Sequence, residues 1–332
     1  MKFRLPFGIG ARWNGRPDCE PLVVPDPADF TLVAIAKDER RYLAEWVAHH
    51  LAIGVPRFIL FDNDSTDGTG AYLRDIAAQV PGLQVIDWPS VEGASPQRSA
   101  YNHAMTLVGT EWVGFIDIDE FLVPWRDGSL RAYLDRAGDD VSAIHVNWRG
   151  FGSNGREAPD YPLVTRHFTR AAVQGWDNNR HYKTLARAKR LGEVFIHHAV
   201  VTEGRRVQSD FSDLAAKRVG ASRHVIHDGI QLNHYQCKTY PEFRARMQRG
   251  QANFPAGHPD KDGLDASRTR FDALDRNEEE DTRILQFHDG MLRMLARIAP
   301  DDGWPKLIRA ADRAPLPACF EAPPRGKPPG SA

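Results

Sequence analysis

Short apolar runs alternate with amphipathic stretches along the first half of the chain, and this order restricts the fold more than any other feature. Apolar runs predict buried strands at residues 31–36, 57–61, 83–88 and 112–116. Helical spacing of apolar residues predicts helices at 42–51, 71–80 and 97–108. Because parallel strands are joined by right-handed crossovers, the order predicts an α/β fold with a mostly parallel central sheet and helices on both faces.

The second half is less regular and predicts an α/β elaboration of the same sheet. A strand is expected at 143–148 and another at 163–168. Helices are expected at 241–251 and 281–298. No clear linker separates the two halves, which favours one domain with additions over two independent domains.

Composition excludes several classes of protein. Of the 332 residues, 42% are hydrophobic, enough for a sizeable core, and the net charge of −1 provides no basic field for nucleic acid. No apolar run approaches the length of a membrane span, and the opening residues lack the apolar region of a secretory signal. Three widely spaced cysteines provide neither a disulfide framework nor a zinc spacing. We therefore expect a cytoplasmic protein.

Two aspartates, Asp117 and Asp119, follow the predicted strand at 112–116. Alternate residues of a strand point the same way, so both carboxylates can face one point. Such a pair suits a hard divalent cation that also holds water and phosphate oxygens, whereas a plain polar turn is the alternative. Lys37 and the 62–64 segment also fall at strand carboxyl ends, where open α/β sheets bind ligands, and this coincidence favours a site.

Asp62, Asn63 and Asp64 follow the second predicted strand. A calcium loop of the EF-hand type is excluded, because its glycine and glutamate positions hold Asp67 and Leu73. We expect the three side chains to bind a base or ribose edge, with an ordinary turn as the alternative.

The sequence lacks a glycine-rich phosphate cradle, since neither Gly-x-Gly-x-x-Gly after a strand nor Gly-Lys-Ser/Thr is present. This argues against a dinucleotide oxidoreductase and a P-loop enzyme. Phosphates would instead meet a metal and basic side chains, for which Lys37, Arg98 and Lys183 are candidates, although each alone is more often a solvated surface cation.

Two histidines, His198 and His234, are candidates to complete a metal site with the aspartates. Imidazole binds Mn²⁺ acceptably beside carboxylates. The alternative for each is a hydrogen-bonded structural histidine. His50 falls on the apolar face of the first predicted helix and is expected to pack in the core.

With these residues in place, the chain resembles glycosyltransferase family 92, within the family-2-like group that has the GT-A fold. The resemblance covers about residues 31–255 and depends on several motifs in a fixed order. These motifs are Lys37-Asp38-Glu39 with Tyr42-Leu43, Glu45-Trp46, His49-His50 and Gly54; Phe61 to Asp67; Gln97 with Ala100-Tyr101-Asn102; Phe115 to Phe121; Trp148 to Gly155; and Lys183, His198 and Asn233-His234-Tyr235 with Lys238, Glu242, Arg249 and Gly250. Asp38 stands where the family usually has asparagine.

The resemblance implies inverting transfer of a sugar from a nucleotide diphosphate donor, expected to be a UDP-sugar, with Mn²⁺ or Mg²⁺ neutralising the departing diphosphate. The implied metal residues are Asp117, Asp119, His198 and His234. The implied nucleotide-binding residues are Lys37, Asp62, Asn63, Asp64, Gln97, Arg98 and Asp117. The implied residues for acceptor or diphosphate are Trp148, Ser153 and Lys183.

A carboxylate must also accept the proton of the acceptor hydroxyl. Family-2 enzymes often place this base in a Glu-Asp pair after the metal motif, and the sequence shows no clear pair of this kind. Asp177 is our first candidate. Glu120 is the second, and it would point away from the metal in an extended strand.

Composition and the resemblance together divide the chain, since both ends are rich in Pro or Gly and the resemblance covers the part between them. We expect an N-terminal arm at 1–29, a catalytic domain at 30–255, a helical extension at 256–320 and a disordered tail at 321–332. Within the catalytic domain, a nucleotide half at 30–125 would precede an acceptor half at 126–255.

Two other functions remain open: a nucleotide- or sugar-binding module without turnover, and a nucleotidyltransferase. The second would usually need a glycine-rich or basic loop for a triphosphate, which is absent from the sequence. For a glycosyltransferase, the expected acceptor is a glycan, an envelope polysaccharide precursor or a lipid-linked acceptor. A lipid-linked acceptor would place the protein at the inner face of the membrane.

Overall fold

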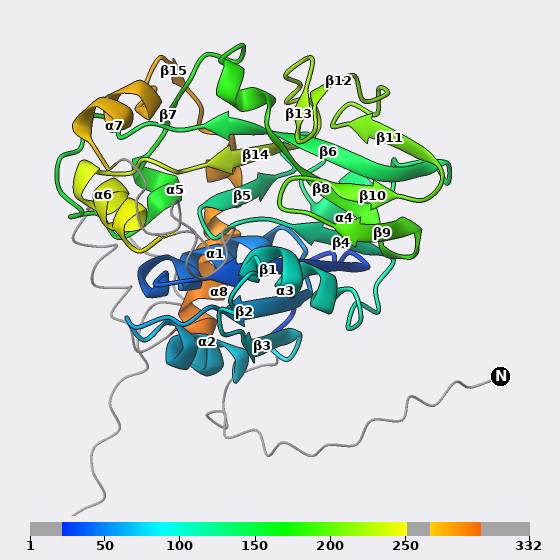
Figure 1. Ribbon diagram of the computed structural model, residues 1–332, viewed down its shortest axis with the longest axis horizontal. Helices are drawn as coiled ribbons and strands as arrows, with labels where there is room; N and C mark the ends of the chain where they lie inside the picture. The colour runs from blue at the N-terminus through cyan, green and yellow to red at the C-terminus, as the bar shows by residue number, and fades with distance from the viewer. Residues whose placement is uncertain (1–21, 251–265, 300–332) are drawn as a thin grey trace, which may run out of the picture.

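A mixed sheet of nine strands forms the centre of the computed structural model, which describes residues 22–250 and 266–299 (Figure 1). Eight strands lie in the order β3-β2-β1-β4-β8-β6-β14-β5, and β11 pairs with β6 beside this path. The strands are β1 (Phe30–Ala36), β2 (Arg57–Asp62), β3 (Leu83–Asp87), β4 (Trp112–Phe115), β5 (Glu120–Val123), β6 (Val141–Gly150), β8 (Tyr182–Arg187), β11 (Arg205–Gln208) and β14 (Gln231–His234).

Most of the strand pairs are parallel. β1 runs parallel to β2 and β4, β2 to β3, and β6 to β11 and β14. β8 is antiparallel to both β4 and β6, and β5 is antiparallel to β14. The predicted α/β fold of the GT-A-like type, with a mostly parallel sheet, is therefore confirmed, and each of the four strands predicted in the first half is present.

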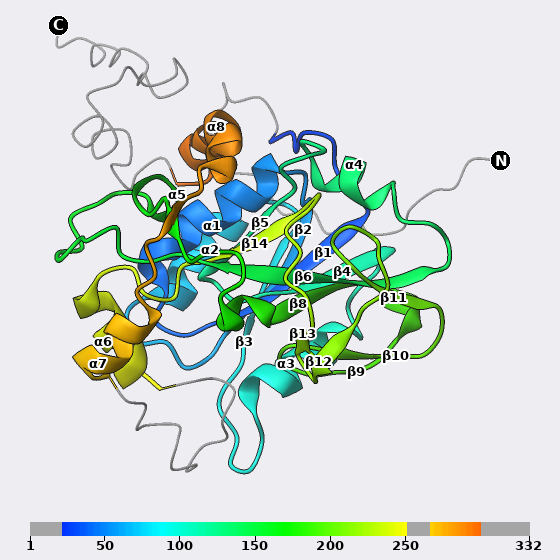
Figure 2. The same ribbon diagram turned by 90° about the horizontal axis from the view of Figure 1, so that it is seen from above.

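Helices cover both faces of the sheet. Alternate residues of β1 point to opposite faces, and the buried residues accordingly divide into two clusters. Leu32 packs in the cluster that includes α1 (Arg40–Ala52), and Val33 packs in the cluster that includes α3 (Pro96–Ala104). Figure 2 shows α1 and α8 (His288–Ile298) on the side of the sheet opposite to α3.

The remaining elements are short. The other helices are α2 (Thr69–Ala77), α4 (Leu130–Leu134), α5 (Val164–His167), α6 (Tyr240–Gln248) and α7 (Arg268–Leu274), with 3₁₀ turns at Asp177–Arg180, Ala188–Arg190 and Arg283–Phe287. The small two-stranded pairs are β7 (Arg170–Ala171) with β15 (Glu279–Glu280), β9 (Leu191–Val194) with β10 (Ala199–Val201), and β12 (Ala216–Arg218) with β13 (Ala221–Ser222).

The strand predicted at 163–168 is wrong, because this segment contains the helical turn α5. The carboxylate of Glu45, on α1, accepts hydrogen bonds from the backbone N–H groups of Val164 and Thr165 and from the Thr165 hydroxyl. A carboxylate that satisfies the free N–H groups at a helix start stabilises the helical turn. This partner lies about 120 residues earlier in the chain, so the local pattern does not reveal it.

Residues 266–299 pack against elements of the first 250 residues. Within the described part of the predicted 256–320 extension, α8 packs against α1 and β15 pairs with β7. The buried Arg149 of β6 forms ion pairs with Asp281 at 3.1 Å and with Glu279 at 2.8 Å. The helix predicted at 281–298 is divided into a 3₁₀ turn and α8. The predicted tail, and most of the predicted arm, lie outside the described residues.

Within residues 22–250 and 266–299, each helix is too short or too polar to cross a membrane.

Candidate active site

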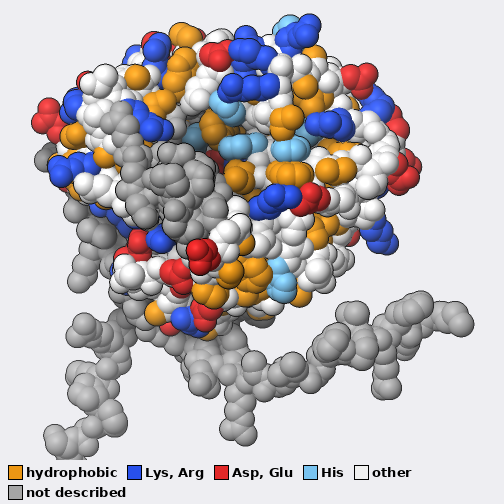
Figure 3. Space-filling view, in the orientation of Figure 1, with side chains coloured by type: hydrophobic (Ala, Val, Ile, Leu, Met, Phe, Trp, Pro, Cys, Tyr) orange, Lys and Arg blue, Asp and Glu red, His pale blue; other side chains and the backbone are white. Residues whose placement is uncertain are grey.

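A polar pocket of about 370 Å³ opens at the carboxyl ends of the parallel strands β1 and β4. Lys37 directly follows β1, and Asp117 follows β4 by two residues. The opposite wall comes from β14, α6 and α7, which provide His234, Arg246 and Arg270. Figure 3 shows histidine side chains gathered in the middle of one face, with Lys and Arg side chains around them.

The two aspartates reach this pocket from a turn. β4 ends at Phe115 and β5 begins at Glu120, so Asp117 and Asp119 lie in neither strand. The Glu120 backbone N–H donates to the Asp117 carbonyl at 3.1 Å, and the Asp117 N–H donates to Glu120 Oε2 at 2.8 Å. The extended geometry predicted for this segment is therefore wrong, although both carboxylates line one pocket as expected.

Three donors hold Asp117, and the most distant of them is the Tyr101 hydroxyl, 3.5 Å from its Oδ1. Lys183 Nζ lies 2.9 Å from its Oδ2, and Gln97 Nε2 donates to its Oδ1 at 2.7 Å. Burial alone would raise the pKa of Asp117, but the Lys183 ammonium outweighs burial and lowers this pKa below its usual value. Asp117 is therefore an anion with a fixed orientation at the floor of the pocket.

Glu120 lies beneath the turn and is fully buried. Trp148 Nε1 donates to its Oε1 at 2.6 Å, and its Oε2 accepts the Asp117 N–H. Burial, together with the charge of Asp117, raises the pKa of Glu120 to about 8 in spite of Lys183 at 3.7 Å. Its side chain supports the turn and Trp148, and it is absent from the residues that line the pocket.

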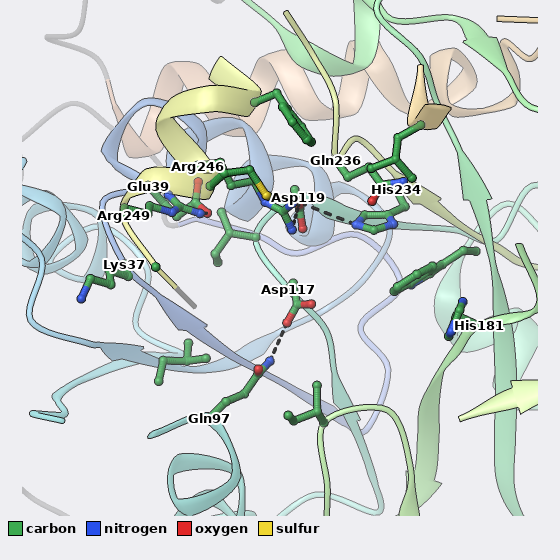
Figure 4. A pocket seen from close by; sticks show the side chains of 18 of the residues that line it. Lys37, Glu39, Gln97, Asp117, Asp119, His181, His234, Gln236, Arg246 and Arg249 are labelled. Atoms are coloured by element: carbon green, nitrogen blue, oxygen red, sulfur yellow. Dashed lines mark hydrogen bonds and ion pairs between the residues drawn. The ribbon is translucent and has the colours of Figure 1, made fainter. Parts of the chain in front are cut away.

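Asp119 faces two partners from the second half of the chain (Figure 4). Its Oδ2 lies 3.1 Å from Arg246 Nη2 and 3.6 Å from His234 Nε2. The register of β14 on β5 pairs His234 with Glu120, and this brings the imidazole beside Asp119. Although burial opposes ionisation, Arg246 and then His234 lower the pKa of Asp119 well below its usual value.

Asp119 and His234 fit a divalent cation. Apart from the ion pair with Arg246, Asp119 Oδ2 is buried without a hydrogen bond. Burial lowers the pKa of His234, which keeps the imidazole neutral for ligation. Neighbouring ligands of an octahedral cation at about 2.1 Å lie roughly 3 Å apart, so these two atoms at 3.6 Å need only a small approach. The described side chains contain no cage of three or more His, Cys, Asp or Glu. Two protein ligands suit a cation that takes phosphate and water as its other ligands.

The segment predicted to bind a base or ribose lies beside the pocket without lining it. Asn63 Nδ2 donates to the Trp88 carbonyl at 2.8 Å and to Ser90 Oγ at 3.1 Å, and Asp64 accepts the Ser90 N–H at 2.8 Å. These bonds join the loops after β2 and β3. Oδ1 of Asp62 and Oδ1 of Asn63 are buried without a hydrogen bond.

Besides Asp62, Asn63, Asp64 and Glu120, five predicted site residues are absent from the pocket lining: Arg98, Ser153, Asp177, Lys183 and His198. Lys183 is buried against Asp117.

The surroundings of Arg98 and His198 explain their absence. Arg98 forms an ion pair with Glu193 and lies over the ring of Phe195. His198 stacks on the same Phe195 ring, with ring centroids 4.5 Å apart. In its place the neighbouring His197 lines the pocket.

Ser153 and Asp177 have partners elsewhere. Ser153 is buried, and its hydroxyl donates to Asp275 at 2.8 Å. The Asp177 carboxylate is 70% exposed and binds Lys217 at 2.7 Å and Arg180 at 2.8 Å. The residue after Asp177, Asn178, does line the pocket.

Sequence reasoning missed several lining residues, and these include His181, His197, Arg246 and Arg270. The pair His197-His198 was visible in the sequence, but the choice between them depends on the β9–β10 hairpin, in which the Phe195 N–H donates to the His198 carbonyl at 2.8 Å. Arg246 and Arg270 had no local signal, because each reaches the pocket through the packing of α6 and α7.

Fold and site together define a class: α/β proteins with a ligand pocket at the carboxyl ends of their parallel strands, where such sheets bind nucleotides. The chain belongs to glycosyltransferase family 92, whose family model matches residues 35–255. It is 24% identical over 255 residues to a family 92 protein of Ricinus communis, covering 72% of this chain and 42% of the relative. It is 27% identical over 274 residues to a family 92 protein of Oryza sativa subsp. japonica, covering 77% of this chain and 42% of that relative. The chain thus spans less than half the length of these relatives.

Solved structures also match. The mannosyltransferase PcManGT of Pyrobaculum calidifontis, in complex with GDP-Man and Mn²⁺, is 16% identical with a TM-score of 0.39, over 93% of this chain and 82% of that one. S. aureus TarS 1-349 is 15% identical with a TM-score of 0.36, over 83% of this chain and 74% of that one.

Proposed function

We propose that this protein is a metal-dependent, inverting glycosyltransferase that moves a sugar from a nucleotide diphosphate donor to a hydroxyl acceptor. The observation that carries the proposal is the facing pair Asp119 and His234, whose Oδ2 and Nε2 atoms lie 3.6 Å apart in a pocket at the strand carboxyl ends. Family 92 membership supports the reaction class.

Asp119 and His234 would hold Mn²⁺ or Mg²⁺, which would neutralise the charge that develops on the departing diphosphate. Arg246 is 3.1 Å from Asp119 Oδ2. In the proposed complex its guanidinium would move from this carboxylate to a phosphate group, to two oxygens of which it can donate parallel hydrogen bonds.

The nucleotide would lie over the β1, β2 and β4 ends. Lys37 lines the pocket there, with no ion pair to any described residue, and its amino group extends away from Asp117 (Figure 4). We propose that Lys37 binds the donor and that Asp117, oriented by Gln97 and Lys183, accepts a hydrogen bond from it. The Asp62–Asp64 segment remains our proposal for the base or ribose. A UDP-sugar is the proposed donor.

The general base must be a carboxylate that can face the acceptor. Glu120 does not meet this requirement, because it is fully buried and both of its oxygens accept N–H groups. We therefore keep Asp177 as the proposed base, since it is exposed and adjoins Asn178 in the pocket lining. Asp177→Ala should abolish sugar transfer while leaving UDP affinity within about twofold.

Trp148 lines the acceptor side and has His234 and His181 against its ring, with centroids 4.2 and 5.0 Å away. Its indole would provide a flat surface for a sugar ring. A glycan or a lipid-linked envelope precursor is the proposed acceptor class, and a cytoplasmic location remains a prediction.

The test is a screen of nucleotide sugars with Mn²⁺ that measures release of the nucleoside diphosphate. We expect slow, Mn²⁺-dependent hydrolysis of one donor, and a loss of at least about 100-fold in Asp119→Ala. The exposed Asp75 on α2 provides the control Asp75→Ala, which should retain full turnover. Full turnover in Asp119→Ala would reject the metal role. UDP binding without hydrolysis or metal dependence would instead favour a binding module.

A further inference from the structure

One wall of the pocket lies outside the segment that the family model matches. The match ends at residue 255, whereas α7 spans Arg268–Leu274. Arg270 and Leu274 of α7 line the pocket beside Phe243 and Met247 of α6. The segment that the family model matches is thus complemented by a wall from α7.

The loop at residues 151–155, Phe-Gly-Ser-Asn-Gly, holds this wall in place. The Ser153 N–H donates to Asp275 Oδ1 at 2.5 Å and its hydroxyl to Oδ2 at 2.8 Å, and the Asn154 N–H donates to Asn277 Oδ1 at 2.8 Å. A Cβ on Gly152 would lie 2.4 Å from the carbonyl oxygen just before Asn277, so only glycine allows this approach. The loop therefore anchors the end of α7, and Arg270 projects from a well-held helix.

Among the described residues, the Arg270 side chain has no partner, unlike those of Arg246 and Arg249. Arg246 pairs with Asp119 and Arg249 pairs with Glu39. The Arg270 guanidinium forms no hydrogen bond or ion pair with any residue in the described ranges 22–250 and 266–299, although it lines the pocket. A divalent cation and a donor diphosphate largely cancel each other's charge, so donor binding leaves Arg270 uncompensated.

We propose that the acceptor carries an anionic group, a phosphate or a carboxylate, which Arg270 binds at the α6–α7 wall. The inference rests on the proposed glycosyltransferase function and names its acceptor class. A guanidinium donates two parallel hydrogen bonds to either anion. Phe243, Met247 and Leu274 line the same pocket. Apolar side chains strengthen such a contact by lowering the local dielectric.

The test is calorimetry on protein saturated with UDP and Mn²⁺, which fills the diphosphate site. Glucose 6-phosphate and glucuronate are the anionic probes, and glucose is their neutral counterpart. We expect at least one anion to bind at least tenfold more tightly than glucose, and the stronger anion identifies phosphate or carboxylate as the group. Arg270→Gln should abolish this preference, and Arg270→Lys should retain part of it. Arg268→Gln is the matched control, because Arg268 is on the same helix, 62% exposed and paired with Asp272.

Equal binding of all three sugars to the wild type, or a preference that survives Arg270→Gln, would overturn the inference. A tenfold loss of UDP affinity in Arg270→Gln would also overturn it, since Arg270 would then belong to the donor. If the wild type does not bind UDP with Mn²⁺, the proposed function fails. The same sugar titrations without UDP then test the anion site by themselves.

Discussion

Lys183→Met removes a buried ammonium from between two carboxylates. Lys183 Nζ lies 2.9 Å from Asp117 Oδ2 and 3.7 Å from Glu120 Oε2, and its side chain is 1% exposed. Removing one partner of a buried ion pair costs roughly 3–5 kcal/mol, because the other charge is left buried without compensation. We expect the free energy of unfolding to fall by about this amount at neutral pH.

The loss should depend on pH in a defined direction. In the wild type the folded-state pKa of Asp117 is lowered, so its stabilising contribution is present above the unfolded-state pKa and is lost as the pH falls through the folded-state value. Without Lys183, burial dominates and raises the folded-state pKa of Asp117 above its unfolded-state value. The variant should then lose stability as the pH rises above about 4.

Urea unfolding followed by tryptophan fluorescence at pH 5 and pH 7.5 measures both effects. The exposed Lys189 provides the control Lys189→Met, expected within about 0.5 kcal/mol of wild type. Adding Asp117→Asn to Lys183→Met should recover most of the stability, because both charges of the pair are then absent. A Lys183→Met loss as small as that of Lys189→Met would refute the reasoning.

Two further predictions concern the scaffold. Gly82→Ala should lower the melting temperature through a loss of about 1–3 kcal/mol, because its Cβ would lie 1.9 Å from the Pro56 carbonyl oxygen. Gly109→Ala, which meets nothing within 4 Å, should be nearly neutral, and equal melting temperatures would contradict this account. Burial opposes ionisation of Asp281, but Arg283 and then Arg149 lower the pKa of Asp281 to about 2. Stability should therefore fall by about 2 kcal/mol between pH 4 and pH 2, and urea titrations of Asp281→Asn should show a smaller decrease over this interval.

Local patterns were sufficient for the nucleotide half of the fold. The apolar run at 31–36 and the run at 112–116 correspond to β1 and β4, whose observed bounds differ by one residue. Because parallel strands end at the same edge of the sheet, the positions of Lys37 and Asp117 in the pocket also followed from the sequence. The ion pair of Asp117 could not be predicted, since its partner Lys183 comes from a strand 66 residues later.

The acceptor half could not be predicted in the same way, because its side chains are placed by contacts distant in sequence. Ser153 is hydrogen-bonded to Asp275, 122 residues later, and therefore does not line the pocket. Arg246 reaches Asp119 through the packing of α6. His198 was predicted at the site, but its neighbour His197 lines the pocket. Both lie in the connection between β9 and β10, whose conformation the local pattern does not reveal.

The central claim is that Asp119 and His234 hold a divalent cation that binds the donor diphosphate. Calorimetric titration of UDP into wild type, Asp119→Asn and the control Asp75→Asn, each with Mn²⁺ and with EDTA, tests it directly. We predict that Mn²⁺ tightens UDP binding at least tenfold in wild type and in Asp75→Asn, and leaves it unchanged in Asp119→Asn. Equal UDP affinity with Mn²⁺ and with EDTA in the wild type would contradict the account.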